Sequence, residues 1–160
     1  MNLTFSKVNS SDDAFLKALY STTRADEMVL APWNETQRSA FLTMQFEAQR
    51  QHYVTKYPNG NFQIVIYNTE RIGRLYTSEL DDEIRIIDIS ILPEYRGKGI
   101  GTRVITDILQ AAAKPVTIYL ESFNPSQSLF ERLGFEPISD EGMYQLWQRP
   151  VNSQTNAAKG

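Results

Sequence analysis

The sequence contains no cysteine and only one histidine, His52, among its 160 residues. The absence of cysteine excludes disulfides, cysteine-ligated zinc and acyl transfer through a cysteine thioester. No apolar run is long enough to cross a membrane, and the first residues lack the basic start and apolar stretch of a secretion signal. These absences predict a cytoplasmic protein with no membrane contact, and no spacing of residues indicates a metal site.

Positive charge is also scarce, because 16 lysines and arginines face 19 aspartates and glutamates and give a net charge of −3. Such a balance argues against a nucleic-acid partner and favours a cationic amine. The length and the 41% hydrophobic content fit a single α/β domain. We expect this domain to cover residues 1–149 and to be followed by a disordered polar tail over residues 150–160.

The most informative segment covers residues 91–102 and reads ILPEYRGKGIGT. It follows an apolar strand pattern and opens a helix pattern whose apolar residues recur on one face from Ile100 to Ala112. Three glycines at alternate positions allow a tight turn that points backbone N–H groups at one spot, in front of a helix N-terminus. Arg96, Lys98 and Arg103 add positive charge. The segment predicts a binding site for a diphosphate.

The spacing of these glycines excludes two common phosphate loops. A Walker loop places its lysine after the last glycine, and the dinucleotide fingerprint would need a third glycine at Thr102. The remaining pattern, Arg96-Gly97-Lys98-Gly99-Ile100-Gly101, resembles the acetyl-coenzyme A loop of the GNAT superfamily of N-acetyltransferases, Arg/Gln-x-x-Gly-x-Gly/Ala.

A second motif lies downstream, between Asn124 and Phe135, and reads NPSQSLFERLGF. It resembles the GNAT pattern Asn-x-x-(Ala/Ser)-x-x-x-Tyr-x-x-x-Gly-Phe, with Pro125 suited to the first helical position and Gly134 to the helix end. The two motifs come in the order of the family, and the resemblance covers roughly residues 62–147.

The resemblance implies a single GNAT-like α/β (α+β) domain. Its mixed, mostly antiparallel sheet of six to seven strands would be flanked by about four helices, with strands four and five splayed to hold the cofactor. The pattern of residues predicts helices from Ser10 or Ser11 to Thr22 and from the Asn34 cap to Val54, joined by a loop from Arg24 to Trp33.

The function that the resemblance implies is transfer of an acetyl group from acetyl-CoA to a primary amine, by direct attack in a ternary complex. In this family the coenzyme is held largely by main-chain atoms. The implied cofactor-binding positions are Ile89, Ser90, Ile91, Arg96, Gly97, Lys98, Gly99, Ile100, Gly101, Thr102, Asn124, Ser128 and Phe130.

The sequence departs from the family at Phe130, where a tyrosine usually protonates the departing thiolate. Phenylalanine cannot donate a proton, so Ser128, Tyr119, Tyr76, water or the acceptor's own ammonium proton would have to replace the tyrosine. A non-catalytic acyl-CoA sensor is the alternative function. Glu121 and Asp88 are the candidate general bases, because both lie on strands beside the expected cleft; pairing of Asp88 with an arginine is the structural alternative.

The acceptor is left open by the sequence. An amino acid or other small amine, an antibiotic, a protein amine and an aminoacyl-tRNA are all compatible with the motifs, and the small amine is favoured because the chain has no extra binding domain. Trp33, Tyr53, Arg74 and Tyr76 are the candidate walls of the acceptor pocket. The sequence is compatible with a monomer or a homodimer.

Overall fold

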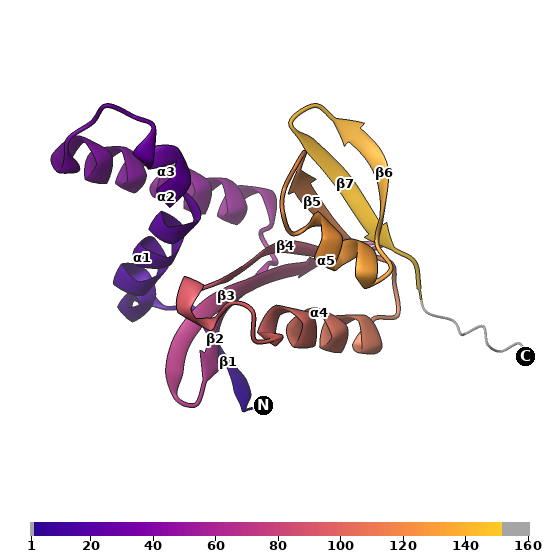
Figure 1. The fold of residues 1–160 in the computed structure, drawn as a ribbon. Coiled ribbons are helices and arrows are strands. Elements are labelled where there is room, and N and C mark those ends of the chain that lie inside the picture. Colours follow the sequence, from indigo (N-terminus) through magenta and orange to yellow (C-terminus); the bar gives the residue numbers. More distant parts are fainter. Residues whose placement is uncertain (1, 152–160) are drawn as a thin grey trace, which may run out of the picture. The chain divides into compact units, whose positions relative to one another are not determined.

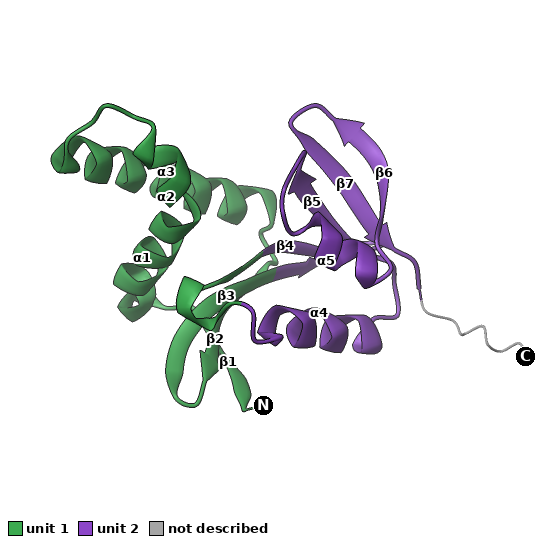
Figure 2. Cartoon of the chain, viewed as in Figure 1, with its two compact units in different colours: residues 1–76, 89–96 green, residues 77–88, 97–160 purple. Residues whose placement is uncertain are grey.

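The computed structural model describes residues 2–151 (Figure 1). Seven strands form one mixed sheet in the order β1-β2-β3-β4-β5-β7-β6. The chain divides into two compact units, coloured separately in Figure 2. Unit 1 comprises residues 1–76 and 89–96, and unit 2 comprises residues 77–88 and 97–160. The expected tail lies outside the described residues from position 152 onward.

Unit 1 joins helices to the first strands of the sheet. Its elements are β1 (Leu3–Lys7), the 3-10 turn η1 (Ser10–Asp12), α1 (Asp13–Thr23), α2 (Ala25–Val29), α3 (Glu35–Lys56), β2 (Asn61–Tyr67), β3 (Glu70–Glu79, to residue 76), the end of β4 from residue 89 and η2 (Pro93–Tyr95). Strands β1 and β2 are antiparallel, with Leu3 opposite Tyr67. A buried cluster of Leu16, Tyr20, Phe46 and Ile64 connects α1, α3 and β2.

Helix caps explain where the helices of unit 1 begin. The predicted capping box of α3 is confirmed, because the Gln37 N–H donates to the Asn34 side chain and the Gln37 side chain accepts from the Asn34 N–H. The first helix starts differently from the prediction, since Asn9 rather than a serine caps η1. The predicted loop after Arg24 contains the short helix α2, which buries Met28 and carries an ion pair of 2.8 Å between Arg24 and Glu27.

Unit 2 contains the start of β4 (Ile84–Ile91, to residue 88), α4 (Ile100–Ala111), β5 (Val116–Glu121), α5 (Gln127–Arg132), β6 (Glu136–Glu141) and β7 (Tyr144–Arg149). Its β4 and β5 are parallel, whereas β5 and β7, and β6 and β7, are antiparallel. The apolar face predicted for α4 is buried at Ile100, Val104 and Ile105.

Two local predictions in unit 2 need correction. Pro125 is not the first residue of α5, because the helix begins at Gln127 after an N-cap at Ser126. The segment after Phe135 forms strand β6, which the sequence analysis did not separate from β7. Almost all residues of β6 are exposed, so the segment lacks the alternation of apolar and polar residues that indicates a strand. The helix stop at Gly134 is confirmed by its φ of 92°.

Candidate functional site

The glycine-rich segment between η2 and α4 turns at two of its glycines. Gly97 and Gly99 are left-handed, with φ of 74° and 80°, and Gly99 is the N-cap of α4. Apart from the adjacent residues and the backbone of α4 itself, no described atom lies within 4 Å of a Cβ built on Gly97, Gly99 or Gly101. The segment therefore presents bare backbone to open space, which a ligand can approach closely.

The first turn of α4 supplies backbone donors beside these glycines. The first helical hydrogen bond described at this end runs from Arg103 N to Gly99 O, at 3.0 Å. The N–H groups of Ile100, Gly101 and Thr102 come before it, and an α-helix leaves the N–H groups of its first turn without intrahelical acceptors. Together with the positive end of the helix dipole, they make a site suited to phosphate.

The three cations of the segment have different roles. The Arg96 Nε donates to the Ile91 carbonyl at 2.9 Å, so this side chain fixes the chain after β4. Arg103 forms an exposed ion pair with Asp107 at 3.0 Å. Lys98 is exposed and, within residues 2–151, makes no ion pair with a carboxylate. Lys98 is therefore the side chain best placed to neutralise a phosphate.

Within unit 2, the described pairing of β4 with β5 joins the first residues of the two strands. The parallel register runs from Ile84 opposite Val116 to Ile86 opposite Ile118, although the two strands continue to Ile91 and Glu121. Within unit 2, the described pairing of β4 with β5 includes neither Ile87 nor Asp88. The splaying of these strands that the family resemblance implied stays a prediction.

Asn124 builds the turn that leads into α5. Its Oδ1 accepts hydrogen bonds from the Ser126 N–H at 2.8 Å and from the Ser126 hydroxyl at 2.6 Å. The side-chain oxygen is thus engaged locally, which leaves the amide nitrogen as the group for a coenzyme. Ser128 is exposed, and its hydroxyl reaches only the Pro125 carbonyl, at 3.5 Å.

Phe130 is a core residue of unit 2. Its exposed fraction is 2%, and its ring packs edge-on against Phe135 with centroids 5.2 Å apart. Burial against another ring explains why phenylalanine is tolerated at this position. The coenzyme contact at Phe130 stays a prediction, and the absence of a hydroxyl here leaves the proton donor to another residue.

The two candidate bases differ in exposure. Glu121 is the exposed last residue of β5, and among the described residues its carboxylate has no hydrogen-bond or ion-pair partner. Its main-chain carbonyl accepts from the Asn124 N–H at 3.0 Å. Asp88 is half-buried. Glu121 is therefore the more accessible of the two carboxylates.

The sequence analysis missed a polar network at the base of β4 and β5. Thr117, 1% exposed, accepts a hydrogen bond from Arg85 Nε at 2.8 Å and donates one to Glu83 at 2.6 Å; Arg85 also donates to Glu83, at 2.7 Å. The Thr117 hydroxyl holds the pKa of the Glu83 carboxyl below its usual value, partial burial opposes this shift, and Arg85 reinforces it. The guanidinium lies 4.8 Å from the Tyr119 ring centroid.

The signal for this network was the alternation of Glu83 with Arg85 and of Thr117 with Tyr119, which places each pair on one face of its strand.

Three of the four predicted acceptor residues come together within unit 1. Tyr53, Arg74 and Tyr76 line a cavity of about 190 Å³ formed by α1, α3 and the strands β1 to β3. Trp33 is not among its lining residues; its ring packs against Phe41 with centroids 4.8 Å apart. His52 is exposed on α3, as the sequence predicted.

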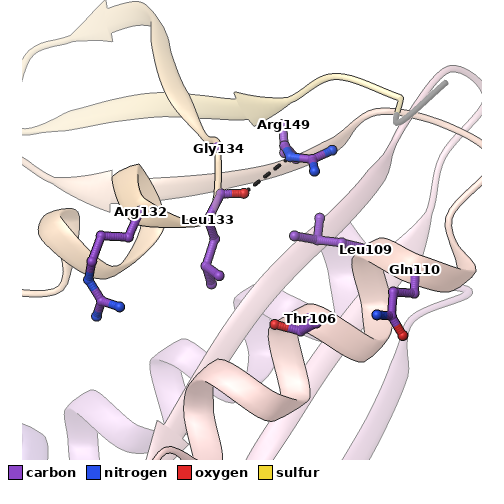
Figure 3. Close-up of a pocket in the computed structure, with 7 residues that line it drawn as sticks. All are labelled: Thr106, Leu109, Gln110, Arg132, Leu133, Gly134 and Arg149. Carbon is purple, nitrogen blue, oxygen red and sulfur yellow. Dashed lines mark hydrogen bonds between the residues drawn. The ribbon is translucent and has the colours of Figure 1, made fainter. Parts of the chain in front are cut away.

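Unit 2 has a separate hollow of about 400 Å³ that none of the predicted site residues line (Figure 3). Its walls come from the second half of α4 and from the end of α5. Arg149 crosses to this end of α5, where its Nε donates to the Leu133 carbonyl at 3.1 Å. This contact fixes the turn at Gly134 and gives the arginine a structural role.

The sequence matches the model of the acetyltransferase (GNAT) family over residues 21–135. The chain belongs to the GNAT family. It is therefore an acyltransferase, and GNAT enzymes use acetyl-CoA as the acetyl donor. The match includes the glycine-rich segment and extends through the second motif to Phe135.

Solved structures agree with the GNAT fold at low sequence identity. The PaiA N-acetyltransferase of Thermoplasma acidophilum, solved with coenzyme A, has a TM-score of 0.69 and 14% identity over 94% of this chain and 99% of its own. An acetyltransferase of Thermus thermophilus gives the same TM-score and identity over 94% of this chain and 98% of its own. The N-acetylglutamate synthase of Neisseria gonorrhoeae matches with a TM-score of 0.61 and 14% identity over 94% of this chain and 35% of its own.

A search of curated proteins found no match. Among the described helices of this GNAT protein, none combines the length and the hydropathy that a membrane span requires.

Proposed function

We propose that this GNAT protein transfers the acetyl group of acetyl-CoA to a primary amine by direct attack in a ternary complex. The observation that carries the proposal is the backbone of residues 97–102. This backbone suits a diphosphate because Gly97 and Gly99 are left-handed and open space lies beside Gly101. The N-terminus of α4 adds N–H groups that have no acceptor within the helix.

Each part of the coenzyme has proposed partners in this chain. The N–H groups of residues 97–102 bind the diphosphate, with Lys98 adding positive charge, whereas the Arg96 N–H already donates to the Pro93 carbonyl at 3.1 Å. Main-chain groups of Ile89, Ser90 and Ile91 bind the pantetheine arm and polarise the thioester carbonyl. The amide nitrogen of Asn124 binds the end of the arm. Bound acetyl-CoA supplies the thioester, whose carbonyl carbon gains the amine while the C–S bond breaks and the thiolate leaves.

Two protons must move in this reaction. The attacking amine loses one, and we propose Glu121 as its acceptor, directly or through water, because its carboxylate is exposed at the end of β5. Asp88 is the second candidate. The departing thiolate gains the other proton, which Phe130 cannot supply. Ser128, Tyr119 on β5 and Tyr76 on β3 carry hydroxyls that are the candidate donors, and solvent is the remaining one.

A thiol-release assay with acetyl-CoA and a panel of primary amines tests the proposal. We expect release that depends on an amine and yields the N-acetyl product, identified by mass spectrometry. Tight acetyl-CoA binding without turnover on any amine would contradict the proposal and favour a binding protein.

A further inference from the structure

Phe123, in the loop between β5 and α5, has a backbone that bulky residues rarely adopt. Its φ is 68°, and it is the third residue of a turn that the Asn124 N–H closes on the Glu121 carbonyl at 3.0 Å. A positive φ at this position of a turn favours glycine or asparagine. Asn68 and Thr69, the other described non-glycine residues with positive φ, form the two-residue connection of β2 and β3, where hairpins require this backbone. The turn after β5 therefore carries a side chain that makes it less stable.

The Phe123 side chain contributes little to the fold in return. It is 96% exposed. The turn is held by polar groups instead, because the Ser122 N–H donates to the Met143 carbonyl at 2.9 Å and the Ser122 hydroxyl donates to the Gly142 carbonyl at 3.2 Å. A glycine at position 123 would leave both hydrogen bonds in place. Backbone strain gathers at functional sites, and exposed apolar groups mark sites of binding.

Phe123 belongs to a larger apolar surface of unit 2, the Phe123 surface, which we define as Phe123, Met143 and Tyr144. Met143 is 74% exposed and Tyr144 is 43% exposed. Tyr144, at the start of β7, lies opposite Glu121, at the end of β5 (Figure 1). Opposed residues of antiparallel strands share a face, so the Tyr144 ring and the Glu121 carboxylate are neighbours. Aromatic residues and methionine are enriched in protein interfaces.

The charges around the Phe123 surface are negative. Tyr144 is opposite Glu121 on one side and opposite Glu141 on the other, so the three residues form a row across β5, β7 and β6. Asp140 precedes Glu141 on β6. Neither the loop between β5 and α5 nor the turn between β6 and β7 contains a lysine or an arginine. The charge complements a positively charged partner.

The exposure of Phe123 indicates the size of its partner. Neither of the two cavities described above is lined by Phe123. A small amine that binds beside Glu121 would cover only part of a ring that is 96% exposed. A polypeptide brings apolar side chains of its own and can cover the ring together with Met143 and Tyr144. Because the surface adjoins Glu121, a bound polypeptide would also place an amine beside the proposed base.

We propose that the Phe123 surface docks a basic polypeptide segment that carries the acceptor amine, either a chain N-terminus or a lysine. An apolar side chain of the segment packs on Phe123 while its amine lies at Glu121. The amine nitrogen then gains the acetyl carbon, the C–S bond breaks, the proton of the amine passes to Glu121 and solvent protonates the thiolate. This inference rests on the proposed function and adds the acceptor class.

Matched peptides test the acceptor class on the unmodified protein. The probe is the hexapeptide Leu-Phe-Lys-Ala-Arg-Ala, compared with leucine amide and butylamine. We expect kcat/KM from thiol release to be about tenfold higher or more for the peptide, the effect of burying one large apolar side chain. Replacing its first two residues with serine, or its two basic residues with glutamate, should each remove most of this advantage. The effect of charge should shrink as salt is raised.

The variant Phe123→Gly tests the residue, because its stability and its activity should change in opposite directions. Relief of the left-handed strain should raise Tm by about 2–4 °C. Over the same substitution, kcat/KM for the peptide should fall about tenfold or more, while KM for acetyl-CoA and kcat/KM for leucine amide stay unchanged. Phe123→Asn should behave in the same way. Met44→Gln, which changes an exposed apolar residue of α3, is the control and should leave peptide acetylation unchanged.

The outcomes separate the two proposals. A higher Tm with undiminished peptide acetylation in Phe123→Gly, or a lower Tm, would overturn the role of Phe123. Acetylation of leucine amide and butylamine as fast as the peptide would overturn the acceptor class and leave the acetyltransferase function standing. A change of oligomeric state in Phe123→Gly, measured by light scattering, with unchanged peptide kinetics would assign the surface to a second copy and overturn the inference. Thiol release with no amine at all would overturn the proposed function.

Discussion

Two glycines with nearly the same backbone offer a matched test of the diphosphate site. Gly99 has φ of 80° and Gly142 has φ of 86°, and, apart from the adjacent residues, no described atom lies within 4 Å of a Cβ built on either. An alanine at each position therefore carries the same left-handed strain, about 1–2 kcal/mol of unfolding free energy. Only Gly99 caps α4 beside the proposed diphosphate site.

The expected effect on coenzyme binding follows from the hydrogen bonds at risk. A Cβ at Gly99 keeps the phosphate away from the backbone and costs at least one charge-assisted hydrogen bond, about 1.5–3 kcal/mol. The dissociation constant of acetyl-CoA should therefore rise about tenfold to 150-fold for Gly99→Ala and stay unchanged for Gly142→Ala. Titration calorimetry measures the affinity and thermal unfolding measures the strain.

A third variant removes the strain from the comparison. Gly101 is the second residue of α4 and has no left-handed backbone, so Gly101→Ala should keep or raise stability while still weakening acetyl-CoA binding. Unchanged affinity in both Gly99→Ala and Gly101→Ala, with both variants folded, would refute the reasoning. Equal losses in Gly99→Ala and Gly142→Ala would refute it as well, because they would reflect general destabilisation.

Three further predictions concern other parts of the molecule. Glu121→Gln should lower turnover below the pKa of the acceptor amine, with recovery at high pH as the amine deprotonates unaided, and a pH profile like that of the unmodified protein would remove Glu121 from the mechanism. Thr117→Val should lower the free energy of unfolding by about 1–3 kcal/mol at neutral pH. Folding lowers the pKa of Glu83, so the stabilisation that Thr117 gives the Glu83 carboxylate is present above the pKa of the unfolded state and declines as the pH falls through the pKa of the folded state. Urea unfolding should therefore show a smaller loss of stability in acid than at neutral pH. Gly73→Ala should lower the free energy of unfolding by about 1–3 kcal/mol, because the added Cβ overlaps the Ser90 carbonyl oxygen, and an unchanged Tm would contradict this. The same variant should also weaken acetyl-CoA binding.

The sequence predicted the elements whose signals are local. The capping box of Asn34 and Gln37, the buried face of α4 and the tight turn at the glycines before it each depend on residues within a few positions of one another. The helix stop at Gly134 belongs to the same group. Such signals act through short-range hydrogen bonds and backbone preference, which a single sequence displays directly.

The features that were missed depend on tertiary contacts. Helix α2 is only five residues long and is held by the burial of Met28 and by an ion pair, neither of which has a periodic signature. The Glu83–Arg85–Thr117 network joins residues 34 positions apart in the chain, so only the parallel register of β4 and β5 brings them together. The ring of Trp33 packs on Phe41, and its place in the wall of the acceptor pocket stays a prediction.

The central claim, that backbone N–H groups of residues 97–102 bind the diphosphate of acetyl-CoA, is tested most directly by NMR on protein labelled with ¹⁵N at glycine. Adding coenzyme A should shift the amide resonances of Gly97, Gly99 and Gly101 and leave that of Gly142 in place, while pantetheine, which lacks the diphosphate, should move none of the three. Saturating coenzyme A that leaves these three resonances unmoved would contradict the account.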